Sequence, residues 1–199
     1  MNVRLNYELE FLAGIYFNDQ LLLNRYSVSI NLLTNTADSA STNIALDRIK
    51  CLVASQFENT VFVKSDQHER AEMMSIMGIN VTTLPEDPVD QIVGIMLFNK
   101  FNAVMEDRME VVALDICSTQ GDGVWYQHDT DDSLGPFGKT GWWNEPTLQH
   151  NDIELEPVID NVVKVKHSDW LEYDLMWPDL DNCATNNTVV FGKFPKNEN

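Results

Sequence analysis

The stretch DPVDQIVGIMLFNKFNAVMEDRMEVVALDICSTQGDGVWY, residues 87–126, contains the clearest helix and strand signals of the chain. Asp87 is the expected N-cap, Pro88 the first helical residue, and Asp90 lies where the positive end of a helix favours a carboxylate. The apolar residues that follow cover a wide arc, which predicts a helix buried on more than one side. Residues 110–118 predict a strand, and the Gly-Asp-Gly turn at 121–123 predicts a partner strand over 124–127.

Alternation within 110–118 assigns its side chains to two faces. Val112, Leu114 and Ile116 are expected on one face, and Asp115 and Cys117 on the other. A nucleophilic role for Cys117 would need a neighbouring base that lowers the pKa of its thiol, so a buried structural thiol is the favoured interpretation.

The front half of the chain predicts a hairpin followed by a helix. Residues 5–11 and 26–32 alternate between apolar and polar, so each is expected to be a strand with one face on the core. Ser41 or Thr42 is the expected cap of the next helix. Apolar residues at helical spacing predict its buried face, with Arg48 and Gln56 elsewhere on the helical wheel. They are Leu46, Ile49, Leu52, Val53 and Phe57.

Together these elements predict an α+β fold with an antiparallel sheet and two main helices packed on one face. Residues 1–127 are expected to form the core, and 128–199 a Trp-rich, acidic C-terminal elaboration packed on it, within a single domain. Further strands are expected at 159–167 and 188–194. A ferredoxin-like split βαβ sheet, in which residues 60–63 and 79–84 are full strands, is the alternative.

Two segments, residues 25–62 and 84–115, contain the stretches that resemble a known family. RYSVSI (25–30), LDRIK (46–50) and FENTVF (57–62), together with LP (84–85), PVDQI (88–92) and VVALD (111–115), resemble the tunnelling fold of the 6-pyruvoyl-tetrahydropterin synthase and 6-carboxytetrahydropterin synthase family. The resemblance covers roughly half of the chain and implies two strands, two helices and two further strands.

The resemblance also implies a zinc site that this sequence lacks. The family holds zinc with three histidines, two of them just before the second strand, where this chain has Leu21, Leu22, Leu23 and Asn24. Leucine offers no metal ligand, so we expect neither a metal nor a cofactor. The family anchors its heterocycle through a Glu on the third strand, and Asp115 occupies the matching place. It either recognises an amino-pyrimidine edge or is an exposed or ion-paired carboxylate.

Composition narrows the function classes. The net charge is −18, and residues 101–182 contain 18 acidic and 4 basic residues, so direct nucleic-acid binding is not expected. The sequence predicts no membrane span and no signal peptide. Three widely spaced cysteines are typical of a reducing compartment, so we expect a cytoplasmic protein. The run His128-Asp129-Thr130-Asp131-Asp132 is better explained as a solvated acidic loop than as a cation site.

All five tryptophans lie between Trp125 and Trp177. Trp142, Trp143, Trp170 and Trp177 are candidate interface residues, because Trp is enriched at binding hot spots; packing within the chain is the alternative. The sequence favours a non-catalytic protein that self-assembles or binds a partner with a basic surface. A divergent tunnelling-fold protein that binds a purine- or pterin-like molecule near Asp115 and Cys117, or an acidic inhibitor that mimics nucleic acid, remains open.

Overall fold

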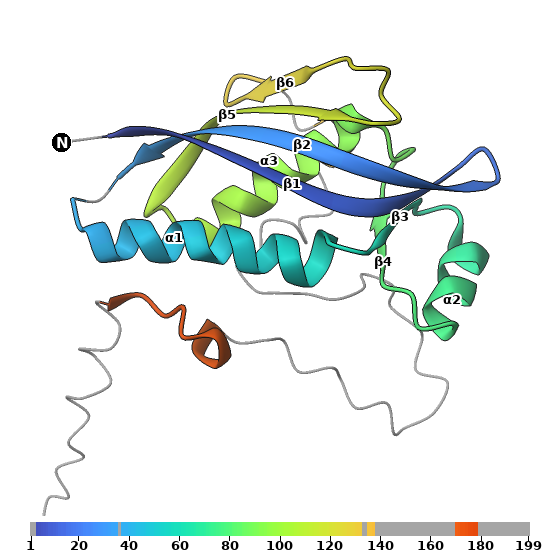
Figure 1. Ribbon diagram of the computed structural model, residues 1–199, viewed down its shortest axis with the longest axis horizontal. Helices are drawn as coiled ribbons and strands as arrows, with labels where there is room; N and C mark the ends of the chain where they lie inside the picture. The colour runs from blue at the N-terminus through green and yellow to red at the C-terminus, as the bar shows by residue number, and fades with distance from the viewer. Residues whose placement is uncertain (1–2, 36, 133–134, 138–169, 179–199) are drawn as a thin grey trace, which may run out of the picture.

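The computed structural model describes residues 3–35, 37–132, 135–137 and 170–178. It has an α+β fold, with one six-stranded sheet and three α-helices (Figure 1). Helices α1 (Ser39–Leu52) and α3 (Asp90–Met105) lie on the same face of the sheet, and α2 (His68–Ile76) lies beside one end of it. The predicted fold class, a sheet with two main helices on one face, is confirmed.

The longest elements are the two strands of the N-terminal hairpin, β1 (Arg4–Phe17) and β2 (Gln20–Thr34). They pair in antiparallel register through a two-residue turn, in which Asn18 and Asp19 have φ angles of 49° and 58°. Such left-handed residues give the turn a twist that matches the strands. The predicted alternation is observed, because every second residue of β2 from Tyr26 to Leu32 is buried.

The strand order is β4-β3-β1-β2-β5-β6. The four strands β1, β2, β5 (Met109–Ser118) and β6 (Tyr126–Asp129) are antiparallel neighbours. The predicted hairpin and the predicted partner of β5 are both found, although β6 begins two residues later than expected. The short strands β3 (Val61–Lys64) and β4 (Val81–Leu84) extend the sheet beside β1 in parallel, so the sheet as a whole is mixed. The chain starts with a hairpin instead of a βαβ unit, which is inconsistent with the ferredoxin-like alternative.

Helix α3 is the central helix, as predicted, with twelve of its sixteen residues buried. Its predicted start is wrong, because Val89 is the N-cap and Asp90 is the first helical residue. Asp87 and Pro88 therefore precede the helix. The carboxylate of Asp90 is directed into the protein, where it accepts a hydrogen bond from Ser118 Oγ at 2.6 Å.

Helix α1 also starts differently from the prediction. Asp38 is its N-cap and accepts hydrogen bonds from the backbone N–H groups of Ala40 and Ser41. Ser41 and Thr42, the predicted caps, lie inside the helix. Arg48, which was expected off the apolar face, is 1% exposed, because a segment distant in sequence covers that side of the helix.

A bulge changes the faces of β5. Asn31 pairs with Ala113 and Leu32 with Val111, so Val112 has no opposite residue on β2. The prediction that Val112 shares a face with Leu114 is wrong, and buried Val111 takes that place in the core. The predicted turn into the last strand is observed, with Gly123 at a φ angle of 74°.

The C-terminal region is described only in part. Residues 170–178, which include the 3₁₀-helix Trp170–Tyr173, contact α1 and α3 through Trp170 and Trp177. The predicted strands 159–167 and 188–194 lie outside the described residues, as do Trp142 and Trp143. Among the described helices, none combines the length and apolar character that crossing a membrane requires.

Candidate functional site

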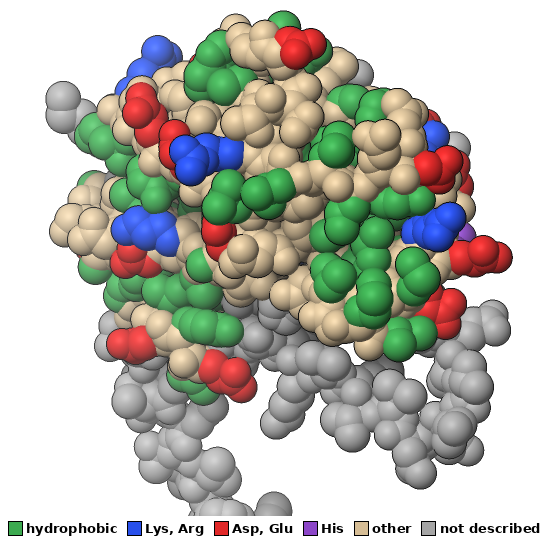
Figure 2. Space-filling view, turned by 45° about the vertical axis from the view of Figure 1, so that its right-hand side comes forward, with side chains coloured by type: hydrophobic (Ala, Val, Ile, Leu, Met, Phe, Trp, Pro, Cys, Tyr) green, Lys and Arg blue, Asp and Glu red, His purple; other side chains and the backbone are tan. Residues whose placement is uncertain are grey.

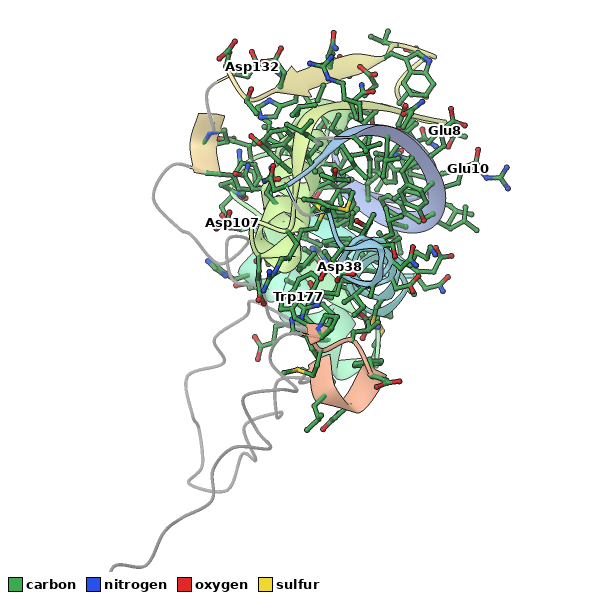
Figure 3. All side chains as sticks on the ribbon, turned by 90° about the vertical axis from the view of Figure 1, so that its left-hand side faces the viewer. Glu8, Glu10, Asp38, Asp107, Asp132 and Trp177 are labelled. Carbon is green, nitrogen blue, oxygen red and sulfur yellow. The ribbon has the colours of Figure 1, made fainter. Side chains whose placement is uncertain are left out.

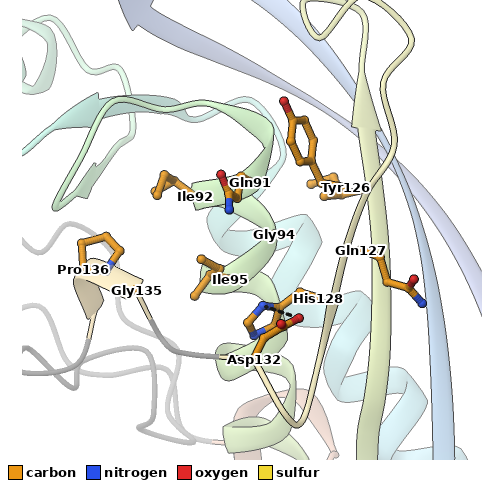
Figure 4. A pocket seen from close by; sticks show the side chains of 11 residues that line it. Gln91, Ile92, Gly94, Ile95, Tyr126, Gln127, His128, Asp132, Gly135 and Pro136 are labelled. Atoms are coloured by element: carbon orange, nitrogen blue, oxygen red, sulfur yellow. Dashed lines mark ion pairs between the residues drawn. The ribbon is translucent and has the colours of Figure 1, made fainter.

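A cavity of about 380 Å³ lies between the first half of α3, strand β6 and the turn Gly135–Phe137 (Figure 4). We call it the α3–β6 cavity. Its lining residues come from four separate segments and combine aliphatic side chains with an imidazole, a phenol, amides and a carboxylate. They are Gln91, Ile92, Gly94, Ile95, Ile116, Tyr126, Gln127, His128, Asp132, Gly135 and Pro136. Figure 4 shows the Gln127 side chain turned away from the others.

Gly94 brings α3 close to the sheet at the floor of this cavity. A Cβ atom at this position would lie 2.9 Å from Cγ2 of Ile116 on β5. Real Cβ atoms do not approach so closely, so only glycine permits this helix–strand separation. The cavity therefore lies beside the close contact between α3 and β5, which requires glycine at position 94.

His128 is the most distinctive side chain of the cavity. Its ring is packed edge-to-face on Phe98, with 4.7 Å between ring centroids, and its Nδ1 lies 3.7 Å from Oδ2 of Asp132. Its Nε2 is buried and has no hydrogen-bond partner among the described residues. Burial lowers the pKa of His128, against the opposing effect of Asp132 and Asp129. The neutral ring therefore offers one donor and one acceptor.

The loop after β6 folds Asp132 back towards His128. The backbone N–H of Asp129 donates to Oδ2 of Asp132 at 3.0 Å, and the N–H of Asp131 donates to Oδ1 of Asp129 at 3.0 Å. These side-chain bonds to the backbone are typical of turns that contain Asp. The described part of the chain holds no group of three or more side chains arranged to bind a metal ion.

A buried polar cluster lies where β2, β5 and the start of α3 meet. Asn24 Oδ1 accepts from Thr119 Oγ1 at 2.9 Å and from the N–H of Gln120 at 3.1 Å. Asn24 Nδ2, Tyr26 OH and Asp90 Oδ2 are buried without a hydrogen-bond partner among the described residues. Burial raises the pKa of both Tyr26 and Asp90, so the cluster favours uncharged groups.

Asp115 and Cys117 lie on the other side of β5 from the α3–β6 cavity. They alternate along the strand with Leu114 and Ile116, which are buried in the core. Asp115 pairs in register with Ser29 and Gln127. The pKa of Cys117 is raised, mainly by burial, which is the direction opposite to nucleophile activation. A ligand-binding role for these two residues stays a prediction.

Trp170 and Trp177 pack within the chain. Trp170 is 6% exposed and Trp177 1% exposed, and the guanidinium of Arg48 lies 4.5 Å and 3.9 Å from their ring centroids. Neither indole offers surface to a partner in this arrangement. Figure 3 shows Asp132 at the top of the molecule and Trp177 in its lower half, so this cluster is separate from the α3–β6 cavity.

The leucines at the position of the family's zinc ligands are mostly on the surface. Leu21 is 53% exposed and Leu23 71%, and both border an apolar depression of about 400 Å³ with Leu12, Gly14 and Val61. Figure 2, which turns this end of the sheet forward, shows hydrophobic side chains at the surface. The depression has no ionisable lining residue, so it favours apolar contacts over acid–base catalysis or metal binding.

Comparisons with known proteins found structures only. No family model matches the sequence, and no curated protein matches it. The fold is similar to an uncharacterized protein of Wolinella succinogenes, with a TM-score of 0.49, 9% identity, and coverage of 66% of this chain and 99% of that chain. It is also similar to the 6-pyruvoyltetrahydropterin synthase of Plasmodium vivax, with a TM-score of 0.43, 12% identity, and coverage of 64% and 97%.

The Plasmodium falciparum 6-pyruvoyl tetrahydropterin synthase matches with a TM-score of 0.41 and 12% identity, over 64% of this chain and 96% of that chain. The resemblance expected from the sequence is therefore also found with the structure.

The sequence alone does not identify Arg48 and His128 as site residues, although each stands in a recognisable pattern. Arg48 follows Ala45 and precedes Ile49 and Leu52 at the spacing of one helix face, a signal that it is covered. His128 lies two residues after Tyr126 on a strand, so the two side chains are directed to the same face of the sheet. Neither pattern identifies what the side chain contacts.

Proposed function

We propose that this protein binds a small polar molecule in the α3–β6 cavity, with His128 as the recognition group. The observation that carries the proposal concerns His128, which lines a cavity of about 380 Å³ and whose Nε2 is buried without a hydrogen-bond partner among the described residues. A buried polar atom without a partner costs roughly 1–3 kcal/mol, and a ligand that supplies the partner removes that cost.

The lining favours a planar molecule with both donors and acceptors. The volume of the cavity lies in the range of small-molecule sites, roughly 300–1,000 Å³. Ile92, Ile95 and Pro136 supply apolar contact, while Gln91 and His128 supply hydrogen-bonding groups. A purine- or pterin-like ring has this combination of flat apolar faces and polar edges. We place that ring here instead of beside Asp115, which lies on the other face of the sheet.

Native mass spectrometry of the purified full chain tests for a retained ligand. Guanosine and neopterin are then titrated against the wild type, His128→Gln and Asp115→Asn. We expect the His128 variant to bind at least about tenfold more weakly, and the Asp115 variant to bind as the wild type does. Loss of binding in the Asp115 variant alone would move the site to the other face. No binding in any variant and no retained mass would overturn the proposal.

The pH dependence supplies a second readout. Because the pKa of His128 is lowered from its ordinary value of 6.5, the ring is neutral at pH 7 and protonates only at lower pH. Protonation removes its acceptor. We therefore expect affinity to be constant above pH 6.5 and to fall below it, measured by the same titration in the wild type and in His128→Gln.

Self-assembly is a second candidate, favoured by the exposed edge of the sheet. Val124, Trp125 and Tyr126 are 48%, 55% and 40% exposed beside β6, whose only strand neighbour in the described part is β5. Exposed strand edges with apolar side chains promote pairing between chains. Light scattering of Val124→Ser/Trp125→Ser should show a lower mass than the wild type. Ile76→Ser, which changes a still more exposed apolar residue on α2, away from this edge, is the control.

A further inference from the structure

The 170–178 segment is docked on a site built around one buried arginine. The site consists of Arg48 on α1, the carbonyl of Val104, Glu106 at the end of α3, and Arg108; we call it the Arg48 site. Arg48 is 1% exposed, although its guanidinium belongs to an α1 side chain expected to face water. It is covered because the rings of Trp170 and Trp177 both lie against its guanidinium.

Two hydrogen bonds join the segment to this site. Arg48 Nε donates to the carbonyl of Leu175 at 2.9 Å, and Trp177 Nε1 donates to Oε2 of Glu106 at 2.7 Å. The guanidinium of Arg108 also lies 5.5 Å from the ring centroid of Trp177. Cation–π contacts of this kind contribute roughly 0.5–2 kcal/mol each, so the docking has a specific chemistry as well as apolar area.

The Arg48 site stays electrostatically satisfied when the segment leaves. Arg48 Nη1 donates to the carbonyl of Val104 at 3.1 Å and to Oε1 of Glu106 at 2.9 Å, and both acceptors belong to the helical layer. Undocking therefore leaves no buried charge without a partner, the feature that makes a broken ion pair costly. An open site is accessible from the docked structure without unfolding α1 or α3.

The segment carries its own local order. The N–H of Leu175 donates to the carbonyl of Trp170 at 2.9 Å, and the N–H of Asp174 to that of Leu171 at 3.3 Å. The contacts that hold it depend only on its sequence, so the segment of another copy makes the same ones.

We propose that the Arg48 site is a peptide-docking surface whose second occupant is the 170–178 segment of another copy of this chain. Residues 138–169 join Phe137 to the segment, and a chain of that length can span at most roughly 110 Å, enough to reach a neighbouring molecule. The exchange produces a segment-swapped dimer. It depends on neither the α3–β6 cavity nor the β6 edge.

Docking within one chain competes with exchange. A tethered segment has an effective concentration on the order of millimolar, so the wild type docks mostly within itself at micromolar concentration. The proposal is therefore tested with two full-length variants that cannot dock alone. Arg48→Met removes the site and keeps the segment, while Trp170→Ala/Trp177→Ala removes the segment and keeps the site.

Mixing these two variants, one of them isotope-labelled, should give a complex with one chain of each in native mass spectrometry. Labelled and unlabelled Arg48→Met, mixed in the same way, measure association through any other surface. A mixed complex well above that background supports exchange. A mixture that forms no more complex than the background overturns it.

A peptide experiment covers the case in which Arg48→Met fails to fold. A fluorescent peptide of residues 168–180 is titrated to about 1 mM, the effective concentration of the tethered segment, against full-length Trp170→Ala/Trp177→Ala. We expect saturable binding, weakened at least about tenfold when the peptide carries Trp177→Ala. Equal binding of the two peptides, or no binding, overturns the proposal.

Discussion

At the scale of the residue, the structure assigns unexpected places to three ionisable side chains. Asp90, predicted near the open end of a helix, is buried with its carboxylate on Ser118. Arg48 is enclosed by two indoles, and His128 lies in a cavity wall. Each departs from the rule that ionisable side chains stay in water, and departures of this kind cluster at functional sites.

The pKa of Asp90 makes a prediction about stability. Burial raises it above the ordinary value of 3.8, so the folded state binds the proton more tightly than the unfolded state. The contribution of Asp90 to stability is therefore full below pH 3.8 and is lost as pH rises through the folded pKa. Asp90→Asn should be more stable than the wild type at pH 7, and this difference should shrink towards pH 3.8. Urea unfolding at several pH values measures it, and a less stable variant at pH 7 would contradict it.

At the scale of the element, capping and close packing decide where the helices lie. Asp38 starts α1 through bonds to two backbone N–H groups. The hydrogen bond from the Ser41 hydroxyl, followed by the bonds from the N–H groups of Ser41 and Ala40, lowers the pKa of its carboxyl group. Gly94 sets the distance between α3 and β5. One residue thus determines a helix end, and another determines a layer separation.

The cap assignment can be checked by comparing two substitutions. Asp38→Ala removes the acceptor for the N–H groups of Ala40 and Ser41, and should lower Tm by roughly 2–6 °C. Thr42→Ala, at a position the sequence suggested as the cap, should lower Tm by less. Thermal unfolding followed by circular dichroism measures both, and a larger loss for Thr42→Ala would show that the cap is assigned to the wrong residue.

Gly94→Ala tests the close approach of α3 to β5. Alanine favours a helix by about 1 kcal/mol over glycine, yet its Cβ atom would meet Cγ2 of Ile116. We expect a net loss of roughly 1–3 kcal/mol in the free energy of unfolding, because overpacking outweighs propensity. Combining it with Ile116→Ala should cost less than the sum of the two single changes, and strict additivity would refute the contact.

At the scale of the whole molecule, charge is the dominant property. The net charge is −18, and the ion pairs in the described residues are few and mostly exposed, such as that between Lys50 and Asp47. Figure 3 shows Glu8 and Glu10 extending outward from β1. Self-repulsion of this size destabilises a compact state, although it also favours solubility.

Salt should therefore stabilise this protein. Raising NaCl from about 20 mM to about 300 mM shortens the screening length severalfold and should raise Tm by roughly 3–6 °C at pH 7. At the isoelectric point of about 4.3 the same change should have little effect, because the repulsion is already reduced. Differential scanning calorimetry measures both, and an equal rise at the two pH values would point to an effect other than charge.

The alternation and helical spacing of the sequence were enough to predict the hairpin, the central helix and the α+β class. A strand or helix records in its own residues which face is apolar, because side-chain direction repeats every 2 or 3.6 residues. The faces of β2 and the burial of α3 follow from this periodicity. The absence of histidines at Leu21–Leu23 is read directly from the sequence.

Only the tertiary structure decided what those faces meet. The bulge at Val112 depends on register with β2, and the burial of Asp90 depends on Ser118 in another element. Arg48 is covered by residues more than 120 positions away, a contact that no local pattern encodes. The α3–β6 cavity and the Arg48 site both arise from such distant pairings, because a site is formed by the packing of elements and not by the elements alone.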